Sequence, residues 1–258
     1  MLKADDITVA FGGVRAVDGV SLEVTEGELL GLVGPNGSGK TTFLNAVCGI
    51  VPARGSLTVA GSAVRLGRPT AARRAGVARV FQAPQVYGEL SCLDNVLLST
   101  SDRRWRGLAG AWPGRPLMWR HERLRWAKAM EALETVGIAG QATEPAARLS
   151  YGGQRLLELA RALAGDPVVL LLDEPSAGLN DGETADLATL LGEVRAAGNT
   201  LVIVDHKIDF LDALCDRLVV LELGQVIARG RPDEVWRDER VISAYLGKSL
   251  EEPADAAD

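Results

Sequence analysis

The stretch "LVGPNGSGKTT", from Leu32 to Thr42, decides the fold of this chain. It continues the apolar run Leu29–Val33, and from Gly34 it has the pattern G-x4-G-K-T. Apolar residues at helical spacing then follow over Thr41–Ile50. Glycines let the main chain approach an anion closely and take dihedral angles that other residues avoid. A strand, this loop and a helix in that order predict a phosphate-binding loop rather than an ordinary glycine-rich turn.

The loop predicts a set of nucleotide contacts. Lys40 is expected to place a point charge on the β- and γ-phosphates, and the Thr41 hydroxyl is expected to help hold Mg²⁺. The start of the following helix also favours anions. The expected nucleotide-binding residues of the loop are Gly34, Pro35, Asn36, Gly37, Ser38, Gly39, Lys40, Thr41 and Thr42.

The overall composition narrows the class of protein. The chain has 258 residues, 47% of them hydrophobic and 24% charged, which is ordinary for a soluble globular protein. Its net charge of −6 argues against a general nucleic-acid binder. The three cysteines form no C-x-x-C pair, which indicates a reducing compartment and no cysteine-based metal site. No apolar stretch reaches the roughly 18 to 20 residues that cross a bilayer, so a membrane role requires a partner.

The pattern of elements predicts an α/β fold. Short apolar runs that suit buried parallel strands alternate with helical patterns, so we expect a P-loop NTPase (RecA-like) core with helices on both faces of the sheet. The first thirty residues alternate as in a small antiparallel sheet, and residues 217–229 read as a hairpin. The predicted core strands are Leu29–Val33, Val77–Phe81, Val168–Asp173 and Thr200–Val204, and two predicted helices are Gln154–Ala164 and Thr184–Ala196.

Between residues 91 and 149 the strand signals stop, which predicts an inserted helical subdomain. Its helix at His121–Val136 is expected to bury a stripe from Leu124 to Val136. We expect four sections: 1–90, the antiparallel subdomain and the first part of the core; 91–154, the helical subdomain; 155–235, the second part of the core; and 236–258, a C-terminal helix and tail. Eight Arg or Lys, one acid and four of the five tryptophans lie in Arg103–Lys128.

The strand at residues 168–173 ends in two acids, Asp173 and Glu174. Ligands bind at such strand ends in α/β sheets, and successive residues on a strand point in opposite directions. Asp173 therefore fits an Mg²⁺ partner acting through water, and Glu174 fits a general base for the attacking water. The alternative is a pair of acids at a solvent-exposed strand end.

With these motifs and the serine-glycine turn that follows Leu149, the chain resembles the ATP-binding cassette (ABC) ATPases. Alone, such a turn would be an ordinary helix N-cap. The resemblance implies that it contacts the γ-phosphate of an ATP bound to the opposite subunit of a head-to-tail dimer. The residues that match the family's signature loop are Ser150, Tyr151, Gly152, Gly153 and Gln154, with Tyr151 as a tolerated variant.

Further positions match that family in order. Gln82 matches the glutamine that touches Mg²⁺ and senses the membrane partner, and His206 matches the histidine that contacts the γ-phosphate. Phe11 matches the aromatic residue that stacks on adenine, although it could equally be a core residue of the small sheet. The loop that crosses the dimer interface, the D-loop, matches Ser176, Ala177, Gly178, Leu179 and Asn180, where many relatives carry Asp at the last position.

Finer features are similar to the ATPase subunits of branched-chain and hydrophobic amino-acid importers. They include "AFGGVRAVDGVSLEV" and "RPDEVWRDERVISAYLGK". The resemblance implies a dimer with itself or a related ATPase, two transmembrane permeases, an extracytoplasmic solute-binding protein acting indirectly, and a place on the cytoplasmic face of the membrane. Urea or amide uptake and lipopolysaccharide export stay as alternatives. Lys207 stands where an acidic residue is common in the subfamily.

Two other classes fit less well. Cassette ATPases that act on DNA or ribosomes usually carry coiled-coil or duplicated segments or zinc-binding cysteines, and this sequence has none. A nucleotide-gated module without catalysis would not need Glu174 and His206.

One hypothesis remains for Arg103–Lys128: that it lies toward the membrane or the permease, because basic clusters are attracted to anionic leaflets. The alternative is a surface excursion whose tryptophans pack on the helical subdomain.

Overall fold

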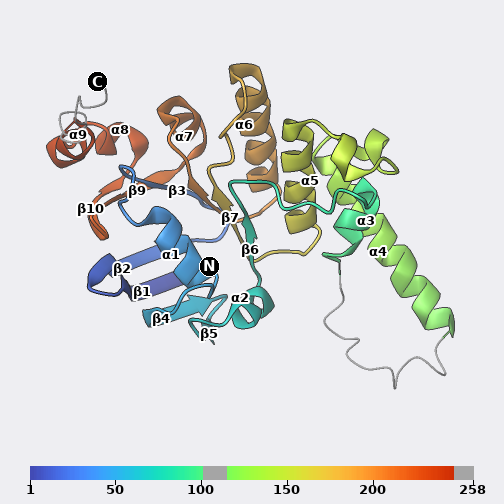
Figure 1. Cartoon of the computed structure of the whole chain (residues 1–258), viewed down its shortest axis with the longest axis horizontal. Coiled ribbons are helices and arrows are strands. Elements are labelled where there is room, and N and C mark those ends of the chain that lie inside the picture. Colours follow the sequence, from blue (N-terminus) through green and yellow to red (C-terminus); the bar gives the residue numbers. More distant parts are fainter. Residues whose placement is uncertain (101–114, 247–258) are drawn as a thin grey trace, which may run out of the picture.

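The computed structural model describes residues 1–100 and 115–246, and it confirms an α/β fold. Two sheets lie side by side, and a helical part extends away from them (Figure 1). Among the described residues, no helix is both long and apolar enough to span a bilayer.

The larger sheet carries the nucleotide-binding motifs. Its six strands have the order β10-β9-β3-β8-β7-β6, and all neighbours are parallel except β10 and β9. The central strands are buried along their whole length, as expected for apolar runs covered on both faces. The strands are β3 (Leu29–Val33), β6 (Val77–Val80), β7 (Val169–Asp173), β8 (Leu201–Val204), β9 (Arg217–Glu222) and β10 (Gln225–Gly230).

The smaller sheet is antiparallel, with the order β2-β1-β4-β5. The sequence predicted β1 (Leu2–Phe11) and β2 (Val14–Val24) but missed β4 (Arg54–Val59) and β5 (Ser62–Val64). The buried side of this sheet shares one apolar core with Leu30, Leu32 and the helix that follows the phosphate loop. That shared core fixes the small sheet relative to the loop.

Helices cover both faces of the larger sheet, and three of them form the helical part (Figure 1). Helix α5 packs on β6 as well as on α3 and α4, so it joins the helical part to the sheet. The helices of the sheet region are α1 (Lys40–Val47), α2 (Pro69–Ala75), α6 (Asp181–Ala196), α7 (Ile208–Leu214), α8 (Pro232–Val235) and α9 (Glu239–Leu246). The helical part holds α3 (Cys92–Leu97), α4 (Arg115–Thr135) and α5 (Tyr151–Leu163), with short 3₁₀ turns at Ala139–Gln141 and Ala146–Arg148.

The helix predicted at His121–Val136 differs from α4 in two ways. Helix α4 begins at Arg115, because Pro116 falls in its first turn, where a missing N–H costs nothing. The predicted buried stripe is wrong at Leu124, which is 65% exposed, and at Ala127, which is also exposed. The buried residues lie farther along the helix, which packs against α3 and α5; they are Ala129, Ala132, Leu133 and Val136.

The hypothesis about the basic, tryptophan-rich segment falls mostly outside the described residues. Residues 101–114 and the tail from 247 are not described, and neither are the side chains of 115–121. At the described end of the segment, Trp126 is exposed, and Arg125 donates hydrogen bonds to the Thr100 hydroxyl and the Leu97 carbonyl. Lys128 pairs with Asp166.

Candidate functional site

The phosphate loop connects β3 to α1 and needs its glycines. Gly34, Gly37 and Gly39 all have positive φ, at 145°, 77° and 103°. A Cβ atom at Gly34 would lie 2.0 Å from the Leu221 carbonyl oxygen, and one at Gly39 would lie 2.3 Å from the Ala16 carbonyl oxygen. Other residues would therefore clash with the main chain of neighbouring strands, so the loop geometry depends on glycine.

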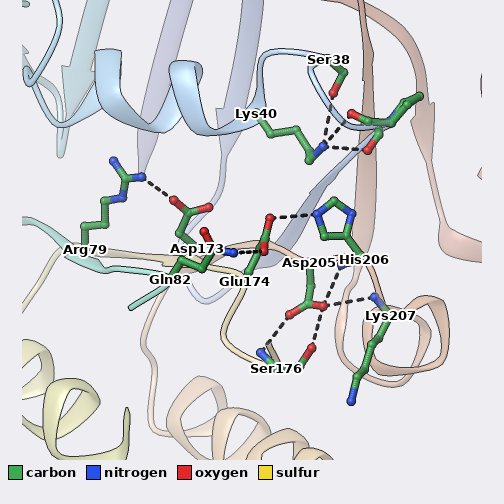
Figure 2. Close-up of polar contacts among 12 residues, drawn as sticks. Ser38, Lys40, Arg79, Gln82, Asp173, Glu174, Ser176, Asp205, His206 and Lys207 are labelled. Atoms are coloured by element: carbon green, nitrogen blue, oxygen red, sulfur yellow. Dashed lines mark hydrogen bonds and ion pairs between the residues drawn. The ribbon is translucent and has the colours of Figure 1, made fainter. Parts of the chain in front are cut away.

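Lys40 begins α1 and is buried under the loop. Its Nζ atom donates to the carbonyl oxygens of Gly34 at 2.7 Å and Pro35 at 2.9 Å (Figure 2). Ser38 Oγ lies 3.4 Å from the same atom. The ammonium group thus bonds across the loop and places a positive charge there, where an anion such as a phosphate would be attracted.

Glu174, directly after β7, is held from two sides. His206 Nε2 lies 2.8 Å from Glu174 Oε1, and Gln82 Nε2 donates to Glu174 Oε2 at 2.6 Å (Figure 2). The backbone of Glu174 has φ of 49°, in the left-handed region that non-glycine residues avoid. Backbone strain of this kind concentrates at functional sites. The structure thus brings Gln82, Glu174 and His206 together.

Asp173 ends β7 beside an arginine that the sequence prediction missed. Arg79 Nη2 lies 2.5 Å from Asp173 Oδ2, and both side chains are only 5% exposed. Arg79 also donates from Nη1 to Asn45 of helix α1 at 2.6 Å. The pair ties β6 and β7 to the helix that carries Lys40 and Thr41.

The surroundings of the Asp173 carboxylate show whether the residues present fit the predicted Mg²⁺ site. Its second oxygen, Oδ1, is buried and receives no hydrogen bond from any described residue. A buried carboxylate oxygen normally has a partner, and Mg²⁺ with its water shell is one that the residues here fit. Asp173 Oδ1, the Thr41 hydroxyl and the Gln82 side chain are the groups that would hold the ion.

The predicted signature turn is the start of α5. Ser150 is the N-cap residue, and its Oγ accepts a hydrogen bond from Gly153 N–H at 3.1 Å. The neighbouring Tyr151 is 45% exposed. The turn therefore presents a hydroxyl and the free N–H groups of a helix start, which suit an anion. In Figure 1, α5 and α1 lie apart, so this turn is not part of the chain's own phosphate loop.

Arg155, one turn into α5, connects the signature turn to the rest of the site. Its guanidinium group donates to the Gln82 carbonyl at 2.6 Å, to the Ala177 carbonyl at 2.9 Å and to the Glu174 carbonyl at 3.1 Å. It also donates to the Tyr151 hydroxyl at 2.9 Å. The sequence prediction did not single out Arg155, because the carbonyl groups that it contacts belong to other segments of the chain.

Two more positions complete the site. Ser176, the first residue of the predicted interface loop, is buried and bonded to Asp205, an acid that follows β8 and that the prediction also missed. Phe11, at the end of β1, is 53% exposed, so it is not a core residue of the small sheet. Its exposed ring remains available for the predicted stacking on adenine.

Comparison with known proteins agrees with this geometry. Residues 17–177 match the ABC transporter family, and residues 225–250 match the branched-chain amino acid ATP-binding cassette transporter family. The chain is 35% identical to the high-affinity branched-chain amino acid transport ATP-binding protein LivG of Salmonella typhimurium and to BraF of Pseudomonas aeruginosa. In both cases the match covers 96% of this chain and 98% of the relative.

Solved structures give the same result. The ADP conformation of an ATP-binding cassette of an ABC transporter superposes with a TM-score of 0.82 at 31% identity, covering 96% of this chain and 98% of that one. A bacterial ABC transporter cassette solved as a dimer gives 0.72 at 27% identity, covering 90% and 99%. Sequence, fold and site thus lead to one assignment: this chain belongs to the family of ATP-binding cassettes of ABC transporters.

Proposed function

We propose that this chain is the ATP-hydrolysing subunit of an ABC importer for branched-chain or other hydrophobic amino acids. The observation that carries the proposal is the arrangement of Glu174 between His206 and Gln82, next to the loop closed by Lys40. A simple nucleotide binder needs the loop and its lysine but has no use for a strained glutamate held by two further side chains.

Each of these residues has a separate role in the proposed ATP hydrolysis. Lys40 and the loop amides bind the β- and γ-phosphates, and Phe11 stacks on the adenine ring. Glu174 accepts a proton from the water that attacks the γ-phosphorus, and His206 holds Glu174 and contacts the γ-phosphate. Asp173, Thr41 and Gln82 would hold Mg²⁺, which would neutralise phosphate charge.

The signature turn requires a second copy or a related ATPase. Ser150 and the free amides at the start of α5 suit a γ-phosphate. Helix α5 lies apart from α1, the helix that follows the chain's own phosphate loop (Figure 1). A head-to-tail dimer brings each turn onto the ATP of the other subunit. ATP binding then closes the dimer, and hydrolysis reopens it.

The cargo and the membrane partners follow from the relatives. The names of LivG and BraF state high-affinity branched-chain amino acid transport, and the C-terminal family match at residues 225–250 supports the same cargo class. We therefore place the chain at the cytoplasmic face of the membrane. There it would act with two permease subunits, and a solute-binding protein would deliver the amino acid from the other side.

The Glu174→Gln variant tests the catalytic part of the proposal. Gln keeps the size of the side chain but cannot accept the proton, so hydrolysis should slow by at least about a hundredfold while ATP affinity is kept. Phosphate release and calorimetric ATP binding measure the two effects. Lys40→Ala is the matched variant for binding, because it should lose ATP affinity itself. Rapid turnover by Glu174→Gln would refute the general-base role.

A further inference from the structure

The D-loop, residues 176–180, is anchored at nearly every residue. Ser176 donates to Asp205 from its N–H at 3.0 Å and from its hydroxyl at 2.7 Å (Figure 2). The Ala177 carbonyl accepts from Arg155, and Gly178 lies against the ring of Tyr151, where a Cβ would come within 3.0 Å of Cε1. The loop is thus held by α5 on one side and by the segment after β8 on the other.

The last anchor is Lys207, the residue after His206. Its Nζ atom donates to the Leu179 carbonyl at 3.3 Å and to Thr184 Oγ1 at 2.8 Å. Its own backbone N–H donates to Asp205 Oδ1 at 3.1 Å, as does that of His206 at 2.7 Å. The segment Asp205–Lys207 therefore binds both ends of the loop and, through His206, Glu174.

Stability alone does not account for a lysine at this position. Lys207 is the N-cap residue of α7, and its side chain caps no backbone N–H. An Asp or Asn there would accept such a hydrogen bond and stabilise the helix start. The ammonium group also lies at Thr184, in the first turn of α6, where the helix dipole disfavours a cation.

We propose that Lys207 is a positioning residue for the D-loop. It holds the C-terminal end of the loop against the strand end that carries His206, so that the loop and the catalytic pair keep a fixed relation. This inference deepens the proposed function, because in that function the loop crosses to the second subunit. A loop held in advance loses less conformational freedom when the dimer closes.

Backbone hydrogen exchange of the full chain without nucleotide tests the anchor directly. The reporters are the N–H groups of Ala177 and Leu179, which are bonded to the carbonyls of Glu174 and Ser176. Lys207→Met keeps the aliphatic stem but removes the donor, so these two amides should exchange about five- to tenfold faster, the loss of one net hydrogen bond. Lys207→Arg keeps donors and should retain most of the protection. Lys3→Met, on an exposed position of β1, is the matched control and should change neither amide.

The Lys207→Asp variant distinguishes a role of Lys207 in positioning the D-loop from a role in the overall stability of the chain. The new carboxylate can cap α7, so the melting temperature should stay equal or rise, while the two loop amides exchange faster as in Lys207→Met. Unchanged exchange in both the Met and Asp variants would overturn the proposal. So would faster exchange that occurs only together with a general loss of stability.

The consequence for the dimer is measured in the Glu174→Gln background with ATP and Mg²⁺. If that parent dimerises, adding Lys207→Met should weaken the dimer about fivefold or more, with ATP affinity of the single subunit unchanged. An equally tight dimer would contradict the role in assembly. A parent that does not dimerise would count against the proposed function, and the exchange measurement would still decide the role of Lys207.

Discussion

At the scale of single residues, the buried ion pair of Arg79 and Asp173 positions one of the predicted site residues. Both side chains are almost completely buried, and Asp173 keeps one oxygen without a partner among the described residues. A buried pair adds little net stability, but removing one partner leaves an uncompensated charge. The pair therefore holds the Asp173 side chain in one orientation at the end of β7.

Arg79→Met should lower the free energy of unfolding by about 3 to 5 kcal/mol, because Asp173 is then buried without its counter-charge. Combining it with Asp173→Asn removes that charge and should recover a large part of the loss. Urea unfolding of the nucleotide-free chain measures Arg79→Met, Asp173→Asn and the double variant. A double variant whose loss equals the sum of the two single losses would show that the residues do not act as a pair.

The sequence identified residues whose role follows from their type and spacing. Lys40 and Glu174 belong to contiguous motifs, so their chemistry could be predicted without knowing which strands are neighbours. Arg79 and Arg155 could not, because each acts on residues from other segments: Arg79 on β7, and Arg155 on three loops. Their partners are defined only once β6, β7 and α5 are placed.

At the scale of elements, the start of α6 stabilises the end of the D-loop. Asn180 is the N-cap residue: its side chain accepts from Glu183 N–H at 2.9 Å, and Glu183 Oε2 accepts from Asn180 N–H at 3.0 Å. This reciprocal capping box explains why α6 begins at Asp181 and not at Thr184, as the apolar periodicity predicted. The N-x-x-E pattern of Asn180 and Glu183 indicates this helix start in the sequence itself.

Asn180→Ala should destabilise the chain by about 1 kcal/mol, the usual loss when a side-chain N-cap is removed. Asn180→Asp keeps an acceptor beside the positive end of the helix dipole and should retain that stability. Chemical unfolding of the two variants gives the comparison. Equal stability of the Ala and Asp variants would contradict the capping role.

The sequence prediction missed elements whose hydrophobic periodicity is weak. Strand β4 begins with Arg54, Gly55 and Ser56, all exposed, and only its second half alternates with buried residues. It is ordered by pairing with β1 rather than by its own periodicity. The sequence also predicts too late a start for α4: the predicted helix begins at His121, whereas α4 begins at Arg115 with Pro116 in its first turn.

At the scale of the whole molecule, the fold class was predictable, and the order of the strands was not. Buried apolar runs separated by helices indicate a parallel sheet, but no local pattern states that β3 lies between β8 and β9. That order brings the phosphate loop, Glu174 and His206 to the same edge of the sheet. It also leaves the signature turn on a separate helix, which is why the proposed function includes a second subunit.

The most direct test of this account is the structure of the Glu174→Gln variant with ATP and Mg²⁺ bound. The account predicts two chains arranged head to tail. In that arrangement one γ-phosphate contacts Lys40 of one copy, and Ser150 Oγ of the other copy lies within hydrogen-bond distance of the same phosphate. Two chains paired so that Ser150 contacts no nucleotide, or ATP fully enclosed by a single chain, would contradict it.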